Sequence, residues 1–360
     1  MMNIRSSSES SHPAGSFRYR RATAACALFG VLWSATTLPT TVHAQNRGLR
    51  WTLMDQGRLP APEVVAMTRD DRGNIYYATR GGLTIEDRTG NYRIVTRATT
   101  PGGPTTDTLT CLGLDRYRDL WVGTDGGGLG VYANGSWRVH TRESTRGGLP
   151  DDGVLALAIH REERWVGTRN GFAALRGGSW TTYSGDRIAG RLPHPAVTAI
   201  AVDSSGDKWI GTIGGLVRLS GAVWTRFTPE STEGGLPQHG ITALYVDAAN
   251  RLWVGTQAGV ARRNPDGTWW RMGMASGLGQ LAGERVASIT GGPEGEIWVS
   301  LRGGAARHLN DEWEVYTRDN VPGLLTLFVN YVLAGPEGEA RIATQKGVMA
   351  RVRVKTESGR

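Results

Sequence analysis

Trp253-Val254-Gly255-Thr256, followed three residues later by Gly259, occurs with small changes seven times in this chain of 360 residues. Three further clean copies begin at Trp121, Trp165 and Trp209, and degenerate copies occupy residues 76–79, 298–301 and 341–344. The copies lie about 44 residues apart, and the later glycine is present in every copy. A fixed period of about 40–45 residues with strand-forming residues in each unit is typical of a β-propeller.

Each unit contains four apolar runs of strand length, separated by turn residues. In the unit around Thr212 these runs cover 197–202, 208–212, 216–219 and 224–228. The sequence therefore predicts an all-β protein, a seven-bladed β-propeller whose blades are four-stranded antiparallel sheets. The predicted blades cover about residues 63–97, 108–142, 153–184, 196–228, 240–273, 285–317 and 328–353.

The two ends of the repeat region complement each other. The seventh unit ends after its third strand at 348–352, without the tryptophan that opens the fourth strand elsewhere. Trp51-Thr52-Leu53-Met54 resembles the fourth strands at 180–183 and 224–227, and Leu-Pro follows it in the same way. We therefore expect a closing strand at 50–54 that completes the last blade and leaves no open sheet edge. The propeller is expected to cover 45–354, with a tail at 355–360.

Residues that tolerate a positive φ stand six positions before most of the Thr positions. They are Gly73, Gly206, Asn250, Gly295 and Gly338. Arg118 and Glu162 break this pattern, which predicts another turn type for those two hairpins. An aromatic residue also recurs 12 or 13 residues after the Thr position: Tyr92, Trp137, Trp180, Trp224, Trp269 and Trp313. We interpret these rings as packing between neighbouring sheets rather than as a binding surface for bases or sugars.

Residues 1–44 have the pattern of an export signal. Arg18, Arg20 and Arg21 precede an uncharged run at 22–42, and Val42-His43-Ala44 predicts cleavage after Ala44. The alternative is an uncleaved membrane anchor, because the run approaches the length that spans a bilayer. Its content of Ser, Thr, Gly and Pro favours cleavage, so we expect a periplasmic or secreted protein.

Cysteine content and charge exclude some classes of protein. Cys26 lies in the predicted signal, so Cys111 has no partner for an internal disulfide and is expected to be a small core residue. The formal net charge is +8, of which the first 44 residues contribute +3. Basic residues are spread along the units without a cluster, so nucleic-acid binding is not expected. The positive charge suits an acidic glycan or another anion.

Each repeat reads Leu-Pro, an apolar strand, Asp-x-x-Gly, Leu-Trp-Val-Gly-Thr and Gly-Leu. The stretch from Gly235-Leu236-Pro237 to Gly259-Val260 shows this pattern well. It resembles the two-component regulator propeller repeat, with Asn250 where that family prefers glycine, and the resemblance covers residues 50–353. The resemblance implies a propeller of the kind that forms the periplasmic sensor part of hybrid histidine kinases, many of them linked to glycan sensing.

The chain departs from that arrangement because only residues 353–360 follow the last strand. We find no second membrane segment, no phosphoacceptor helix and no ATP-binding region. The resemblance therefore implies a stand-alone exported propeller without kinase activity, and we expect no cofactor. The expected partners are a small anionic or glycan ligand, or a separate membrane signalling protein.

Loops that join the second and third strands of a propeller share a face with the loops that lead into each blade, and loops often carry function. The candidate ligand-binding residues in these loops are Arg80, Asp125, Arg169, Asn170, His194, His239, Arg302 and Lys346. The same loops contain Glu63, Asp107, Asp151, Asp152, Ile213, Gln257, Glu284, Arg285, Asn330 and Gln345. We interpret Arg80, Arg169, Arg302 and Lys346 as a partly basic ring for carboxylate or sulfate groups. The alternative is that they are ordinary solvated turn charges.

A catalytic propeller is the alternative function. Streptogramin lyases and some lactonases are propellers that use His and Glu with a metal, and His194 and His239 lie near equivalent places in adjacent units. The two histidines are one register apart, however, and no third ligand has a recognisable spacing. We therefore predict no metal site and no catalytic residue. A non-catalytic sensor or interaction module is favoured over a metal-dependent enzyme.

Overall fold

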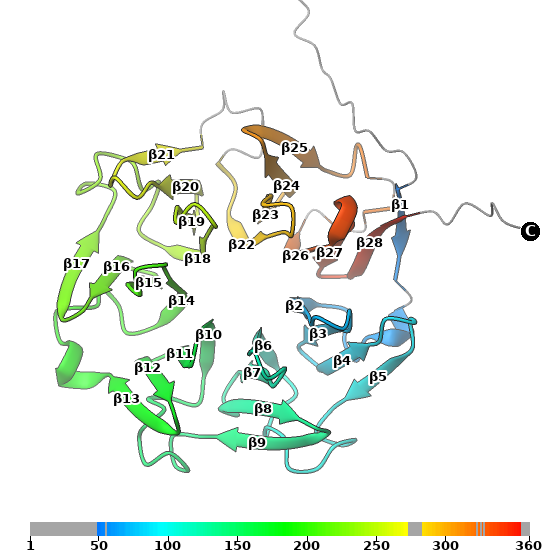
Figure 1. The fold of residues 1–360 in the computed structure, drawn as a ribbon, viewed down its shortest axis with the longest axis horizontal. Helices are drawn as coiled ribbons and strands as arrows, with labels where there is room; N and C mark the ends of the chain where they lie inside the picture. Colours follow the sequence, from blue (N-terminus) through cyan, green and yellow to red (C-terminus); the bar gives the residue numbers. More distant parts are fainter. Residues whose placement is uncertain are drawn as a thin grey trace, which may run out of the picture. The chain divides into compact units, whose positions relative to one another are not determined.

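The computed structural model describes residues 49–54, 56–272, 283–321, 323–324, 326 and 328–353. The predicted signal at 1–44 and the predicted tail at 355–360 lie outside these residues. The described part forms a seven-bladed β-propeller with four antiparallel strands in each blade, as predicted (Figure 1). No helix in this part is long and apolar enough to cross a membrane.

The first six blades follow the chain in order, each with its innermost strand first (Figure 1). Blade 1 is β2 (Val64–Arg69), β3 (Ile75–Thr79), β4 (Gly82–Glu86) and β5 (Tyr92–Val95). Blade 2 is β6 (Leu109–Leu114), β7 (Leu120–Thr124), β8 (Leu129–Ala133) and β9 (Ser136–His140). Blade 3 is β10 (Val154–His160), β11 (Glu163–Thr168), β12 (Gly171–Arg176) and β13 (Ser179–Tyr183).

Blades 4 to 6 repeat the same plan. Blade 4 is β14 (Val197–Val202), β15 (Lys208–Thr212), β16 (Gly215–Ser220) and β17 (Val223–Phe227). Blade 5 is β18 (Ile241–Val246), β19 (Leu252–Thr256), β20 (Gly259–Arg263) and β21 (Trp269–Arg271). Blade 6 is β22 (Val286–Gly291), β23 (Ile297–Leu301), β24 (Gly304–Leu309) and β25 (Glu312–Tyr316). Short 3-10 turns occur at η1 (Gln56–Arg58), η2 (Gly185–Ile188) and η4 (Pro336–Gly338).

Blade 7 contains strands from both ends of the described chain. It consists of β26 (Val329–Ala334), β27 (Ala340–Thr344), β28 (Gly347–Arg353) and β1 (Leu49–Leu53). β1 pairs antiparallel with β28, from Leu49 opposite Arg353 to Leu53 opposite Met349. Trp51 packs edge-on against Tyr316 of blade 6, with ring centroids 5.7 Å apart. The predicted closing strand is therefore confirmed.

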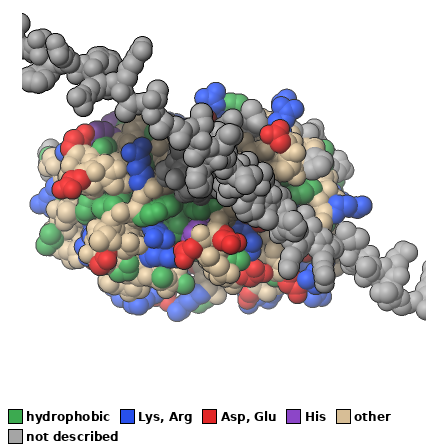
Figure 2. Space-filling view, turned by 90° about the horizontal axis from the view of Figure 1, so that it is seen from above, with side chains coloured by type: hydrophobic (Ala, Val, Ile, Leu, Met, Phe, Trp, Pro, Cys, Tyr) green, Lys and Arg blue, Asp and Glu red, His purple; other side chains and the backbone are tan. Residues whose placement is uncertain are grey.

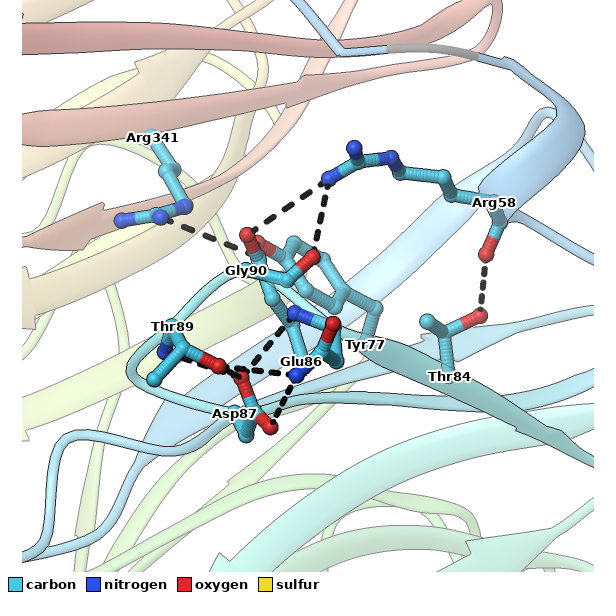
Figure 3. A network of polar contacts seen from close by, with 9 residues as sticks. Arg58, Tyr77, Thr84, Glu86, Asp87, Thr89, Gly90 and Arg341 are labelled. Carbon is cyan, nitrogen blue, oxygen red and sulfur yellow. Dashed lines mark hydrogen bonds and ion pairs between the residues drawn. The ribbon is translucent and has the colours of Figure 1, made fainter.

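A polar network joins blade 1 to blade 7 at this closure (Figure 3). Glu86 at the end of β4 accepts a hydrogen bond from the hydroxyl of Tyr77 at 2.5 Å and lies 3.7 Å from Arg341 of β27. Arg58 of η1 approaches the same carboxylate at 4.0 Å, and its carbonyl oxygen accepts a hydrogen bond from Thr84 at 2.8 Å. The network links the segment after the closing strand, the last blade and the first blade.

One turn prediction is wrong and one is confirmed. Arg118 was expected to use a different turn, but it has a φ of 67° and the same hydrogen-bonded turn as Gly73 and Gly206. The Asp115 carboxylate explains this, because it accepts the backbone N–H groups of Tyr117 and Asp119 and so holds the turn whichever residue stands at position 118. The hairpin at Glu162 does differ, since β10 and β11 are joined by two residues only.

The recurrent aromatic residues of the fourth strands pack between blades, as predicted. Trp137, Trp180, Trp224, Trp269 and Trp313 are partly buried against the hydrophobic clusters between neighbouring sheets. Tyr92 is an exception, because 44% of its surface is exposed and the Arg58 guanidinium lies 5.3 Å from its ring centroid. Cys111 is a free cysteine that is only partly buried at the edge of the cluster between blades 2 and 3.

The tryptophan of the repeated motif is held by the aspartate of the preceding turn. The indole N–H donates to the carboxylate six residues earlier in three blades: Trp121 to Asp115 at 3.1 Å, Trp209 to Asp203 at 3.0 Å and Trp253 to Asp247 at 2.8 Å. In blade 6 the corresponding residue is Gly292, and the buried Trp298 indole nitrogen has no hydrogen-bond partner among the described residues. The Asp-x-x-Gly and Trp parts of the repeat therefore act together in positioning the second strand.

Candidate functional site

The Thr and Gly of the repeated motif build the turn between the second and third strands. Thr168 is fully buried, and its hydroxyl donates to the carbonyl oxygen of Gly171 at 2.9 Å and accepts the N–H of Asn170 at 3.2 Å. Gly171 has a φ of 97°, and a Cβ there would lie 2.2 Å from the carbonyl oxygen of Tyr183. The motif thus presents Arg169 and Asn170 at the end of the blade.

These turns share one face of the propeller with the loops that lead into the blades. The residue after the Thr position donates its backbone N–H to the residue that precedes the first strand of the same blade. This bond joins Arg169 to Gly153 at 3.0 Å, Gln257 to Gly240 at 3.2 Å and Arg302 to Arg285 at 3.2 Å. We call this face, which carries the turns that follow the Thr positions, the Thr face. The opposite face, which carries the turns between the first and second strands, is the hairpin face.

On the Thr face of blades 1 to 3, the candidate arginines are paired with carboxylates. Arg80 Nε lies 2.9 Å from a carboxylate oxygen of Glu63, the residue that precedes β2. Arg169 forms an ion pair with Asp125 across the joint between blades 2 and 3. Arg80, Asp125 and Arg169 are therefore each engaged in a local ion pair, and in blades 1 to 3 the structure brings Asp125 and Arg169 together.

The two candidate histidines also have local partners. His194 Nδ1 accepts the backbone N–H of Ala196 at 3.0 Å. His239 Nε2 lies 3.3 Å from a carboxylate oxygen of Glu230, and both side chains are exposed. Across the described residues, no group of three or more His, Cys, Asp and Glu side chains is arranged to hold a metal ion.

A cavity of about 540 Å³ opens on the Thr face of blades 5 to 7. Its lining residues come from three turns, two leading loops and the first strands β22 and β26: Gln257, Gly283, Glu284, Arg285, Ala287, Arg302, Phe328, Val329, Asn330 and Gln345. We call this cavity the Thr-face groove. Of the eight candidate residues, Arg302 lines it, and Lys346 follows the lining residue Gln345 directly.

The arginines of the Thr-face groove differ from those of blades 1 to 3. The Arg302 guanidinium lies 5.3 Å from the ring centroid of Phe328, which is 39% exposed. Arg285 occupies in blade 6 the place that Glu63 occupies in blade 1, directly before the first strand. Among the described residues neither Arg285 nor Arg302 forms an ion pair, although Glu284 also lines the groove. The groove therefore presents two cations and one aromatic ring to solvent.

Charged side chains are spread over the rim of the propeller, so the presence of arginines alone does not mark a site. In a view onto the rim, charged side chains of both signs lie toward both faces, with hydrophobic side chains gathered between them (Figure 2). What distinguishes Arg302 from Arg80 and Arg169 is that it lines a cavity and has no paired carboxylate among the residues that the structure describes.

Phe328 was missed by the sequence reasoning. The position before the first strand holds Glu63, Thr108, Gly153, Ala196, Gly240, Arg285 and Phe328 in the seven blades. Phe328 is the one large aromatic residue at this position in the seven blades, and this difference between the repeats could have pointed to it in the sequence.

The family and structure comparisons agree with this architecture. Residues 235–258 match the model described as two component regulator propeller. The match identifies a repeat of that family in this chain and confirms the resemblance predicted from the sequence. No curated protein matches the chain in sequence.

Three solved structures illustrate the fold likeness. The extracellular domain of a putative hybrid two component system from B. thetaiotaomicron aligns with a TM-score of 0.71 and 19% identity over 84% of this chain and 41% of its own length. A second such domain from the same organism gives a TM-score of 0.65 and 17% identity, over 86% of this chain and 40% of its own. Streptogramin B lyase gives a TM-score of 0.65 and 15% identity, over 85% of this chain and 98% of the lyase.

At these identities the likeness establishes the propeller fold. This chain spans about two fifths of the length of the two component system domains.

Proposed function

We propose that the chain is an exported, non-catalytic β-propeller that senses a small anionic or glycan ligand in the Thr-face groove, or uses that groove to bind a partner. The observation that carries the proposal is Arg302, an exposed arginine beside an exposed aromatic ring in a cavity, without an ion pair among the described residues.

The size and lining of the Thr-face groove support a small ligand. Its volume of about 540 Å³ falls within the range of about 300–1,000 Å³ that is usual for small-molecule sites. Phe328 offers a ring face for stacking, and Gln257, Asn330 and Gln345 offer amide groups that exchange hydrogen bonds with hydroxyls. A sugar ring that carries an acidic group matches this combination.

The positive charge of the groove supports an anion. A guanidinium binds carboxylate, sulfate and phosphate through two parallel N–H groups. Arg285 and Arg302 are bonded to each other through the backbone, so both guanidinium groups start from adjacent points of one blade. The ligand would supply the negative charge that Glu63 supplies to Arg80 in blade 1.

The sensor part of the proposal draws on the comparisons. A two component regulator propeller repeat and the fold likeness to extracellular domains of hybrid two component systems favour a signalling role over a purely structural one. A separate membrane protein would be the partner that transmits the signal. Export is part of this proposal, and mass spectrometry of exported material should find a chain that starts at Gln45.

A thermal-shift screen tests the proposal. The wild type and Phe328→Ala would be heated with acidic and neutral oligosaccharides, small carboxylates and divalent metal salts, because any ligand of the native state raises its apparent stability. We expect an acidic saccharide or carboxylate to stabilise the wild type and to stabilise Phe328→Ala less. Equal stabilisation of both proteins would place the ligand outside the Thr-face groove.

A metal-dependent lyase or lactonase is the second candidate. The observation in its favour is the fold likeness to streptogramin B lyase, which extends over 98% of that protein. Stoichiometric metal in the purified chain, lost in His194→Ala or His239→Ala together with a lyase or lactonase activity, would favour this candidate over the sensor.

A further inference from the structure

Toward the hairpin face, blades 4 to 6 each contain the same cross-strand pair, a tryptophan opposite an arginine. The arginine of the third strand lies opposite the tryptophan of the second: Arg218 opposite Trp209, Arg262 opposite Trp253 and Arg307 opposite Trp298. These pairs lie at the end of the strands away from the Thr face, because Thr256 pairs with Gly259 at the other end of the same hairpin. The three arginines can therefore be compared directly.

Two of these arginines have carboxylate partners. Arg218 donates from two nitrogens to one carboxylate oxygen of Asp207, with a distance of 2.8 Å from Nε. Arg307 lies 3.2 Å from Glu294 and 3.8 Å from Glu314. In blades 4 and 6 the charge of this arginine is thus balanced by a carboxylate of the same blade.

Arg262 forms no ion pair with any described residue. The place of Asp207 in blade 4 is taken in blade 5 by Arg251, which stands four residues after the turn aspartate just as Asp207 does. Arg251 pairs with that aspartate, Asp247, at 2.6 Å. Arg262 therefore faces a like charge where Arg218 faces an acid.

The surroundings of Arg262 make an external anion favourable. Burial lowers the pKa of its guanidinium, and the charge of Arg251 lowers it further, while the charges of Asp311 and Asp247 act in the opposite direction with a smaller effect. Its Nε atom is buried without a hydrogen-bond partner, although this is also true of the paired Arg307. A carboxylate or sulfate bound here would relieve the repulsion between the two arginines.

Aromatic rings flank the same guanidinium. The Arg262 side chain lies 5.5 Å from the ring centroid of Trp253 and 5.4 Å from that of Trp270. Trp270 is particular to blade 5, because Thr225 stands opposite the arginine in blade 4 and Glu314 in blade 6. It is partly exposed. Its ring gives the apolar part of a ligand a surface to contact.

We propose that Arg262, Arg251 and Trp270 form a second binding site, on the hairpin face of blade 5, for the oxyanion of a carboxylate or a sulfate. Arg262 binds the oxyanion, and Trp270 contacts whatever carries the anion. Arg251, which is paired with Asp247, takes the place of the carboxylate that Arg218 has in blade 4 and so leaves Arg262 without an internal partner among the described residues. This site lies at the opposite end of the strands from the Thr-face groove and does not depend on it.

The test is isothermal titration of the full chain with D-glucuronate and, separately, with inorganic sulfate. Each titration is repeated in an Arg302→Gln background, so that binding in the Thr-face groove does not contribute. Arg262→Gln keeps a polar side chain but removes the charge, and we expect it to weaken binding at least about tenfold. Tighter binding of glucuronate, lost in Trp270→Thr, would identify a sugar acid, and equal binding would identify the bare oxyanion.

A second variant reproduces blade 4 within blade 5. Arg251→Asp places a carboxylate where blade 4 has Asp207, so that Arg262 gains an internal partner. We expect this variant to lose anion binding at least about tenfold while its melting temperature stays the same or rises. The matched control is Arg218→Gln, which should leave the anion affinity unchanged. Binding that is equal in the wild type, Arg262→Gln and Arg251→Asp, or no saturable binding to the wild type, would overturn the proposal.

Discussion

The two sides of the Thr face carry arginines at the same position of the repeat, but only one side balances them. In blades 1 to 3, Arg80 and Arg169 are paired with Glu63 and Asp125. In blade 6, Arg302 contacts the ring of Phe328 and borders a cavity, and the place of Glu63 is taken by Arg285. A charge at a repeated position is therefore not enough to propose a site. Our proposal rests instead on an arginine that borders a cavity and has no carboxylate partner among the described residues.

The largest loss of stability is expected when the closed ring of blades, which carries both sides of the Thr face, is opened. Deletion of residues 49–53 removes β1, and with it the whole fourth strand of blade 7 and the contact of Trp51 with Tyr316. The expected loss is comparable with the entire stability of a domain, about 5–15 kcal/mol, so cooperative thermal unfolding followed by circular dichroism should disappear. A deletion variant that melts like the wild type would contradict the closed ring.

The next largest loss of stability is expected when a buried ion pair is broken, and it should exceed the loss from breaking an exposed pair. The Asp115 side chain is 1% exposed, is paired with Arg164 and accepts the Trp121 indole N–H at 3.1 Å. Asp115→Asn should cost about 3 kcal/mol in urea denaturation, because it leaves the Arg164 charge buried without its partner. Asp125→Asn, in an exposed pair, is the control and should cost less than about 1 kcal/mol. Equal costs would contradict this distinction.

The same aspartate gives a pH dependence. Burial acts to raise the pKa of Asp115, but hydrogen bonds from Arg164, Trp121 and two backbone N–H groups outweigh it and hold the pKa below its usual value. Because the folded pKa is lowered, this stabilisation is present above the unfolded pKa of about 4 and is lost as the pH falls through the folded pKa. The difference in stability between the wild type and Asp115→Asn should therefore shrink below about pH 4. A constant difference would exclude the aspartate charge as its cause.

A moderate effect is expected when the arrangement of blade 1 is transferred to blade 6. Arg285→Glu places an acid next to Arg302, as Glu63 stands next to Arg80. The internal pair should compete with the ligand, so the affinity for an acidic saccharide should fall at least about tenfold, with no loss of melting temperature. Unchanged affinity in calorimetry would mean that the positive charge of the groove is not used.

The smallest effects are expected from the paired arginines. Arg80→Ala and Arg169→Ala each remove an exposed ion pair, which is worth about 0–1 kcal/mol. Their melting temperatures should stay close to that of the wild type, and their affinity for an acidic ligand should not change. A loss of affinity in either variant would extend the site to blades 1 to 3.

The fold was predictable because its determinants are local and repeated. Trp253-Val254-Gly255-Thr256 encodes a strand and the turn after it, and in blades 3 to 5 the Thr hydroxyl bonds to the glycine three residues later. Blade 2 differs by one residue, because Thr124 bonds to Gly128. The closing strand was predictable because Trp51 supplies what the seventh unit lacks. The turn at Arg118 was not, because the hydrogen bonds of Asp115 outweigh the backbone preference of an arginine.

The site was harder to predict because pairing is not local. Glu63 lies 17 residues before Arg80, and Asp125 lies 44 residues before Arg169, one repeat period away. The sequence therefore shows which loops carry arginines and carboxylates, but not which arginine is paired with which carboxylate. The cavity beside Phe328 depends on how three blades meet, which no single repeat encodes.

The role of the unpaired arginine is tested most directly by comparing Arg302→Gln with Arg169→Gln in calorimetric titrations with the acidic saccharide or carboxylate that stabilises the wild type best. Both arginines occupy the position after the motif, and both variants remove one positive charge from the Thr face. We expect a loss of affinity of at least about tenfold for Arg302→Gln and none for Arg169→Gln. Equal losses in the two variants, or a loss in Arg169→Gln alone, would contradict this expectation.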